Sequence, residues 1–157
     1  MRQTLRFLEV FALGTWVGAI LYFAAVVTRG AFAVLPNADL AGSLVGFTIR
    51  GLHWFGIVAA VVYLAAALGL GRSLQALLQP AALGVVLMLV LTVASQGMVV
   101  ARMDALRAKM VSVAGTPRDN SLRVEFDRLH RISVGLESGV LLIGLTALYL
   151  TVREASR

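Results

Sequence analysis

Cysteine is absent from the 157-residue chain. Its absence excludes disulfide bonds, thiolate metal sites and cysteine nucleophiles. Charged residues are scarce, at 14% of the chain, and only 8 of them are acidic against 14 Lys and Arg. Proline occurs only 3 times, so few positions interrupt a helix. A chain with so little charge departs from the composition of a water-soluble domain, in which about a quarter of the residues are charged.

Long uncharged runs take the place of charge. Hydrophobic residues make up 59% of the chain, and its mean hydropathy is +0.88. A transmembrane helix needs about 20 mostly apolar residues to cross about 30 Å of hydrocarbon. Four segments meet this requirement, at about 7–28, 51–71, 80–101 and 132–152. We therefore expect an all-α, polytopic membrane four-helix bundle that forms one domain over residues 1–157.

The segment before the second span is expected to be helical too. Its pattern runs from Ala38 to Gly71, which is longer than one upright span requires. Either Asn37 or Asp39 is a suitable N-cap residue. We expect an interfacial helix over about 38–50, with one continuous tilted helix as the alternative.

The connection between the third and fourth spans is expected to be a helical hairpin. Met103, Leu106 and Met110 continue an apolar stripe beyond the third span. Gly115 breaks the pattern, and the following Thr116–Asp119 segment resembles a helix start with Thr as N-cap and Pro at the first position. The sequence thus predicts a hairpin over about 102–131 that protrudes from the bilayer by about three turns.

Three glycine pairs have the spacing that lets membrane helices approach closely. We expect these glycines to pack helices within the chain, and a homodimer contact is the alternative. They are Gly14 and Gly18, Gly42 and Gly46, and Gly135 and Gly139.

A small set of polar residues falls at one end of the expected bundle. Glu137 lies six residues past Arg131, about 9 Å into an apolar span, where a carboxylate must be paired, protonated or hydrated. Alternating helix directions bring the other polar residues of the spans to the same membrane side. The candidate cluster consists of His53, Gln96, Arg102, His130, Ser133 and Glu137.

Three interpretations of this cluster stay open. It is an electrostatic lock between helices, a site that handles protons or a small cation, or a cofactor site. In the last case His53 and His130 would ligate haem iron, or join Met98 or Met103 on copper in a redox subunit. Catalytic sequence motifs are absent, so we expect no enzymatic activity.

Basic residues indicate the surroundings and the orientation. Arg at helix ends faces anionic lipid headgroups, so we expect lipid as a partner and no nucleic acid. A homo-oligomer or a larger membrane complex, with this chain as an assembly subunit, is a further expectation. Nine Lys and Arg fall on the side of loops 1–2 and 3–4, against five on the other, which favours those loops in the cytoplasm of a bacterial inner (plasma) membrane protein.

Several short motifs resemble a known family. They are the Thr28–Phe32 end of the first span, Leu40–Gly46, and Phe126–Ser133 entering the fourth span. Together they resemble the transmembrane protein 205-like domain, small four-helix membrane proteins without an assigned activity. The resemblance implies the four-helix fold and matches the family pattern at Phe126, Leu129, His130 and Ser133. Glu137 stands where the family more often has Asn.

Overall fold

The computed structural model describes residues 1–155 and is built almost entirely of helix. Span 1 combines α1 (Arg2–Tyr22), the π-helical segment η1 (Phe23–Val27) and α2 (Thr28–Val34). Span 2 is α3 (Ala38–Gly71), followed by the short 3-10 helix η2 (Leu74–Leu78). Span 3 combines α4 (Pro80–Ala94), the π-helical segment η3 (Ser95–Val100) and α5 (Ala101–Arg107). Span 4 is α6 (Ser121–Ala155).

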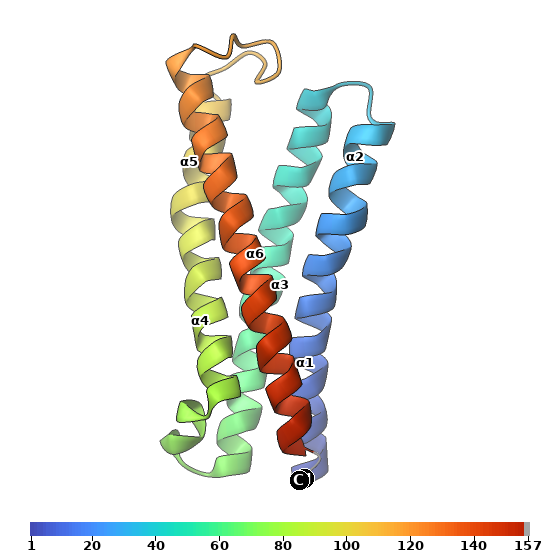
Figure 1. Cartoon of the computed structure of the whole chain (residues 1–157), viewed down its shortest axis with the longest axis vertical. Helices are drawn as coiled ribbons and strands as arrows, with labels where there is room; N and C mark the ends of the chain where they lie inside the picture. Colours follow the sequence, from blue (N-terminus) through green and yellow to red (C-terminus); the bar gives the residue numbers. More distant parts are fainter. Residues whose placement is uncertain (156–157) are drawn as a thin grey trace.

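Four of these helices are long and apolar enough to cross a membrane, which confirms the expected four-helix bundle. They run alternately up and down, as Figure 1 shows. The loop end of the bundle carries residues 35–37 and 108–120, and the terminal end carries residues 72–79 and both ends of the chain. Spans 1, 2 and 4 have 33 or 34 residues and measure about 50 Å, and span 3 has 28 residues and measures about 42 Å. All four are longer than the hydrocarbon layer of about 30 Å.

The helices form a closed ring of neighbours. Span 1 packs against α3 and α6, and α4 packs against the same two helices. This arrangement leaves α3 and α6 on a diagonal of the bundle, where they run in the same direction (Figure 1). A side-chain bond between α3 and α6 therefore crosses the centre of the bundle.

An apolar core fills the middle of the bundle. Its largest buried side chains are Leu13, Trp16, Val85, Met88 and Val140, none more than 1% exposed. Small residues surround them and let the helices approach closely. These are Ala12, Ala59, Ala60, Ala67, Ala82 and Ala147.

Two glycines make room for large core side chains. A Cβ at Gly56 would lie 2.3 Å from the indole Nε1 of Trp16. A Cβ at Gly144 would lie 2.8 Å from both Met88 and Val17. These distances are too short for real carbon contacts, so the packing of α3 and α6 requires glycine at both positions.

The glycines singled out by their spacing behave differently. A Cβ at Gly42 would meet the guanidinium group of Arg107 at 3.3 Å. The other five would meet no atom of the described chain within 4 Å, namely Gly14, Gly18, Gly46, Gly135 and Gly139. Close packing within the chain is therefore not seen at these five glycines, and contacts between chains at these positions stay a prediction.

Large apolar side chains cover the outer surface of the helices. Phe11, Phe47, Trp54, Val58 and Tyr149 are each more than half exposed. An apolar exterior over a helix bundle is what a lipid environment requires, because lipid tails solvate these side chains.

The structure corrects two local predictions in spans 1 and 2. Residues 38–50 are not a separate interfacial helix, because α3 continues unbroken from Ala38 to Gly71, which is the continuous helix expected as the alternative. Asn37 caps this helix as expected, with its side-chain oxygen accepting from the Leu40 amide at 2.9 Å. Span 1 extends six residues beyond its expected end, to Val34, and Leu35, which precedes Pro36, has an extended backbone.

The hairpin between spans 3 and 4 also differs in detail. Its first helix ends at Arg107 and α6 begins only at Ser121, so residues 108–120 form a loop. Thr116 is not the N-cap of α6, since its hydroxyl donates to the Ser112 carbonyl. Asn120 serves at that helix start, with its side-chain oxygen accepting from the Leu122 amide at 2.9 Å. The protrusion of 102–131 from the bilayer stays a prediction.

Candidate functional site

His53 is the most deeply buried ionisable side chain in the upper half of the bundle. It lies 15 residues into α3, about 22 Å from the loop end of that helix. Its side chain is 1% exposed. A buried imidazole needs hydrogen-bond partners, because an unpaired polar group in an apolar interior costs about 1–3 kcal/mol.

Both ring nitrogens of His53 have a partner from another helix. Nδ1 lies 2.8 Å from Oε1 of Gln96 in η3, and Nε2 lies 2.6 Å from Oε1 of Glu137 in α6. We call these three residues the His53 site. The bond between His53 and Glu137 joins α3 to α6 across the diagonal of the bundle.

Gln96 reaches His53 from a π-helical segment. The wider turns of η3 occupy Ser95–Val100, within a span that is otherwise α-helical. Short π segments inside α-helices occur frequently at functional sites. Ser95, next to Gln96, is 1% exposed, and its hydroxyl has no hydrogen-bond partner among the described residues.

The distances limit how protons can be arranged in the His53 site. With the Gln96 oxygen facing Nδ1, this nitrogen carries a proton and donates it. One further proton then lies between Nε2 and Glu137. It gives either an imidazolium with a carboxylate or a neutral imidazole with a carboxylic acid. Both arrangements have zero net charge, so the pair can hold this proton inside an apolar span.

Loss of that proton demands a rearrangement. A carboxylate facing an unprotonated Nε2 at 2.6 Å would bring two lone pairs together. If the Gln96 amide turns, its NH2 group donates to Nδ1 and the remaining ring proton moves to Nε2, which then donates to Glu137. The orientation of Gln96 is thus coupled to the number of protons that His53 and Glu137 share.

Exposure within the site is uneven. The His53 side chain is 1% exposed, and that of Glu137 is 15% exposed. Of the two side chains, Glu137 is therefore the one in contact with the surroundings of the bundle. Ser133, one turn earlier on α6, is 6% exposed. It extends the polar side of this helix towards the loop end.

A layer of ion pairs lies between the His53 site and the loop end. Arg50 in α3 pairs with Asp104 in α5, and Arg102 pairs with Glu125 at 2.9 Å. Arg50 stands three residues before His53, so its charge lies one helical turn away. Asp104 and Glu125 were not predicted as partners from the sequence. Their acidic side chains near the end of an apolar span are a usable signal for ion pairs with Arg50 and Arg102.

The structure brings together three of the six predicted cluster residues. His53, Gln96 and Glu137 are in contact, and Ser133 is buried one turn away. Arg102 is engaged with Glu125 instead, and His130 is exposed on α6. The sequence also gave no indication of the π-helical turn, beyond the polar and small residues Ser95, Gln96 and Gly97 within an apolar run.

The residues suggested for haem or copper do not form a ligand set here. Both nitrogens of His53 are hydrogen-bonded, so neither nitrogen can bind a metal without the loss of a hydrogen bond. His130 is exposed, and Met98 is 73% exposed. Residues 1–155 contain no group of three His, Asp or Glu side chains suited to a metal ion, and a haem or copper site stays an untested alternative.

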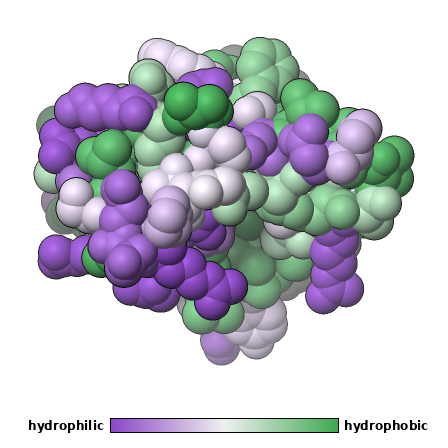
Figure 2. All heavy atoms as spheres, turned by 90° about the horizontal axis from the view of Figure 1, so that it is seen from above, coloured by the Kyte–Doolittle hydropathy of each residue, from purple (hydrophilic) through white to green (hydrophobic). Residues whose placement is uncertain are grey.

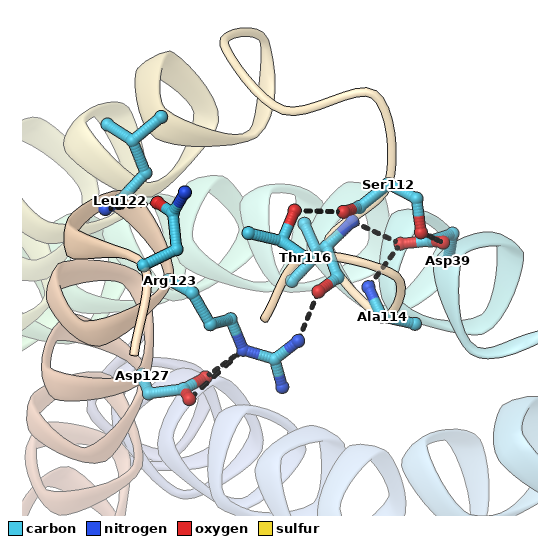
Figure 3. A network of polar contacts seen from close by, with 9 residues as sticks. Asp39, Ser112, Ala114, Thr116, Leu122, Arg123 and Asp127 are labelled. Atoms are coloured by element: carbon cyan, nitrogen blue, oxygen red, sulfur yellow. Dashed lines mark hydrogen bonds and ion pairs between the residues drawn. The ribbon is translucent and has the colours of Figure 1, made fainter. Parts of the chain in front are cut away.

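A second polar network fixes the loop of residues 108–120 to the start of α3, and we call it the loop network (Figure 3). Asp39 accepts hydrogen bonds from the Ser112 hydroxyl at 2.5 Å and from the amides of Val113 and Ala114 at 2.9 and 3.2 Å. Arg123 of α6 donates to the Val113 carbonyl and to Asp127.

Arg107 joins α5 to the same end of α3. Its guanidinium donates to the Ser43 hydroxyl at 2.9 Å and lies 5.6 Å from the centre of the Phe126 ring. Figure 2 looks onto this loop end and shows hydrophilic side chains over much of it, with hydrophobic ones between them. A polar cap of this kind suits a helix bundle whose end leaves the hydrocarbon layer.

Four apolar helices of membrane-spanning length, with a buried hydrogen-bonded His and Glu between them, define a multi-pass membrane protein. The chain belongs to the family described as "Domain of unknown function (DUF4149)", whose model matches residues 11–112. That match includes His53 and Gln96 and ends before Glu137. No curated protein matches the chain. No solved structure matches it either.

Proposed function

We propose that this protein is a non-enzymatic membrane protein that takes up and releases a proton at the His53 site. The observation that carries the proposal is the engagement of both His53 nitrogens by side-chain oxygens from two other helices. A pair that can hold one shared proton in two neutral arrangements is suited to proton exchange within an apolar span.

The surroundings of the pair support a carrier more than an open channel. The core side chains Trp16, Val85, Met88 and Val140 fill the bundle centre, and each is at most 1% exposed. Such an apolar layer offers no hydrogen-bonded path for a proton through this conformation. A proton that crosses the membrane through the site therefore requires a second arrangement of the helices, so transport would be slow and saturable.

The experiment uses liposomes that contain the purified protein and an entrapped pH indicator, with proton entry driven by a membrane potential. We expect Glu137→Gln, which keeps the size but cannot ionise, to lower the initial proton flux at least about tenfold, as loss of an essential proton-transfer group does. The matched control is Glu125→Gln on the same helix, whose carboxylate pairs with exposed Arg102.

Thermal stability separates proton exchange from a purely structural lock. A site that handles protons keeps a melting temperature within a few degrees in Glu137→Gln while it loses flux. A lock loses stability in that variant, and its wild-type protein gives no flux above that of empty liposomes. Loss of stability in Glu137→Gln, together with no flux through the wild-type protein, would refute the proposal.

The proposed setting is a bacterial inner membrane with the loop end in the cytoplasm. Among the described residues, nine Lys and Arg belong to the loop end and four to the terminal end, and cytoplasmic loops carry the excess of basic residues. The relationship to the transmembrane protein 205-like domain, based on the motifs of Thr28–Phe32 and Phe126–Ser133, is also part of this proposal.

A further inference from the structure

A second polar site lies at the other end of the bundle. A cavity of about 570 Å³ opens where α1, α3, η2, α4 and α6 meet, and we call it the terminal cavity. Cavities of this size hold small ligands or the polar part of a larger one. Its charged and polar lining includes Arg2, Arg6, Glu9, Tyr63, Gln79 and Glu154.

Glu9 is the feature that indicates a ligand. The residue is 4% exposed, and its carboxylate accepts a hydrogen bond from Arg6 at 3.4 Å. A carboxylate can accept about four hydrogen bonds. Much of the accepting capacity of this buried group thus faces the cavity, and Glu154 adds a second negative charge close to it.

Tyr63 supplies a further acceptor in the same cavity. The Thr151 hydroxyl donates its only proton to the Ala147 carbonyl at 2.9 Å. Tyr63 must therefore be the donor in its 2.8 Å bond with Thr151. The phenolic oxygen keeps its lone pairs, so it can accept a hydrogen bond from a group next to Glu9.

The charges of the lining indicate a ligand that carries one positive and one negative charge. Two arginines and two glutamates line the terminal cavity, so their charges sum to zero. Three acceptors, on Glu9, Glu154 and Tyr63, match the three N–H donors of a primary ammonium group. Arg2 near the mouth matches a phosphate, for which guanidinium groups have a well-suited geometry.

We propose that the terminal cavity binds a zwitterion composed of a primary ammonium group and a phosphate, as in the headgroup of a phosphoethanolamine lipid. The cavity lies at one end of helices that are long and apolar enough to span a membrane, and lipid headgroups flank the hydrocarbon layer that such helices cross. The ammonium binds at Glu9 and Tyr63, and the phosphate binds at Arg2. This inference does not depend on the function proposed for the His53 site.

The test measures lipid binding by native mass spectrometry and by the rise in melting temperature. The probes are a phosphoethanolamine lipid, a phosphocholine lipid without N–H donors, and a phosphoglycerol lipid without an ammonium. We expect the first to bind at least about tenfold more tightly than the other two, because they lack the charge-assisted hydrogen bonds to Glu9. Soluble glycerophosphoethanolamine shows whether the same headgroup also binds from the aqueous phase.

Variants assign the binding to the terminal cavity. Glu9→Gln should weaken the binding of the phosphoethanolamine lipid about tenfold. Glu125→Gln, at the opposite end of the bundle, should leave this binding unchanged. Arg2→Gln changes an exposed residue and should also weaken binding, which decides the matter if Glu9→Gln does not fold. If only soluble glycerophosphoethanolamine binds, the ligand has the proposed chemistry but comes from the aqueous phase. Equal binding of all three lipids, or binding unaffected by both cavity variants, would overturn the proposal.

Discussion

At the scale of single residues, side chains that are rare in a membrane span explain most of the arrangement. Glu137 and His53 satisfy each other across the bundle, so neither is left as an unpaired group in the apolar interior. Tyr63 and Thr151 form a second bond between α3 and α6 nearer the terminal end. These two bonds brace the same diagonal on either side of the apolar core.

Gly56 offers a residue-scale test of that core. We expect Gly56→Ala to lower the free energy of unfolding by about 1–3 kcal/mol, because the new methyl group would overlap the Trp16 ring. Thermal or denaturant unfolding in detergent measures the effect. Gly135→Ala is the matched control, since its Cβ meets nothing within 4 Å and alanine favours helix. Equal melting temperatures of the two variants would show that Trp16 does not pack on α3 as described.

At the scale of elements, the loop of residues 108–120 owes its position to the start of α3. Asp39 lies in the first turn of that helix, where a negative charge is also favoured by the helix dipole. Its three bonds to residues 112–114 hold a segment that lacks regular structure. The loop is therefore an ordered cover over the loop end.

Asp39→Asn tests this attachment. Loss of the carboxylate removes charge-assisted hydrogen bonds, so we expect the amides of Val113 and Ala114 to exchange about tenfold faster with deuterium. Asp119→Asn, an exposed aspartate in the same loop, should leave their exchange unchanged. If both variants protect these amides as well as the wild-type protein does, Asp39 does not hold the loop.

The elements also show what the sequence could and could not predict. The four spans follow from uncharged runs of sufficient length, and the helix starts after Asn37 and at residue 80 lie where they were expected. Span 1 continues to Val34 because Gly30 does not break it, and it ends only where Pro36 disfavours helix at Leu35. Its π-helical segment η1 has no clear signal in one sequence. Pairing of Gln96 with His53 depended on the helix rotation set by η3. Alternating helix directions predicted that His53, Gln96 and Glu137 belong to one cluster of six residues, but not which members of the cluster are in contact.

At the scale of the whole molecule, polarity is arranged in layers along the bundle. The loop network and the ion pairs of Arg50 and Arg102 occupy the loop end, followed by the His53 site. Beyond them lie the apolar core and the terminal cavity. The His53 site and the terminal cavity are thus separated by an apolar layer, which favours independent roles for them.

Accessibility from the two membrane sides tests this layered arrangement. The chain has no cysteine, so single substitutions can be labelled without background. In sealed vesicles of known orientation, we expect Ser73→Cys and Lys109→Cys to react with an impermeant maleimide from opposite sides, with Lys109→Cys on the cytoplasmic side. Labelling of both from one side would contradict the four-span topology. Opposite-side labelling with the sides exchanged would contradict only the proposed orientation.

The most direct test of the account is the nitrogen NMR spectrum of the two histidines in lipid nanodiscs from about pH 5 to about pH 9. His53 and exposed His130 are the only imidazoles, so the two signals can be assigned with one substitution each. The account predicts that the His53 nitrogens change protonation within this range, and that Glu137→Gln alters this change while the His130 signal stays the same. A His53 signal that is constant over the whole range, in both proteins, would show that the buried pair is a fixed structural bond and exchanges no proton.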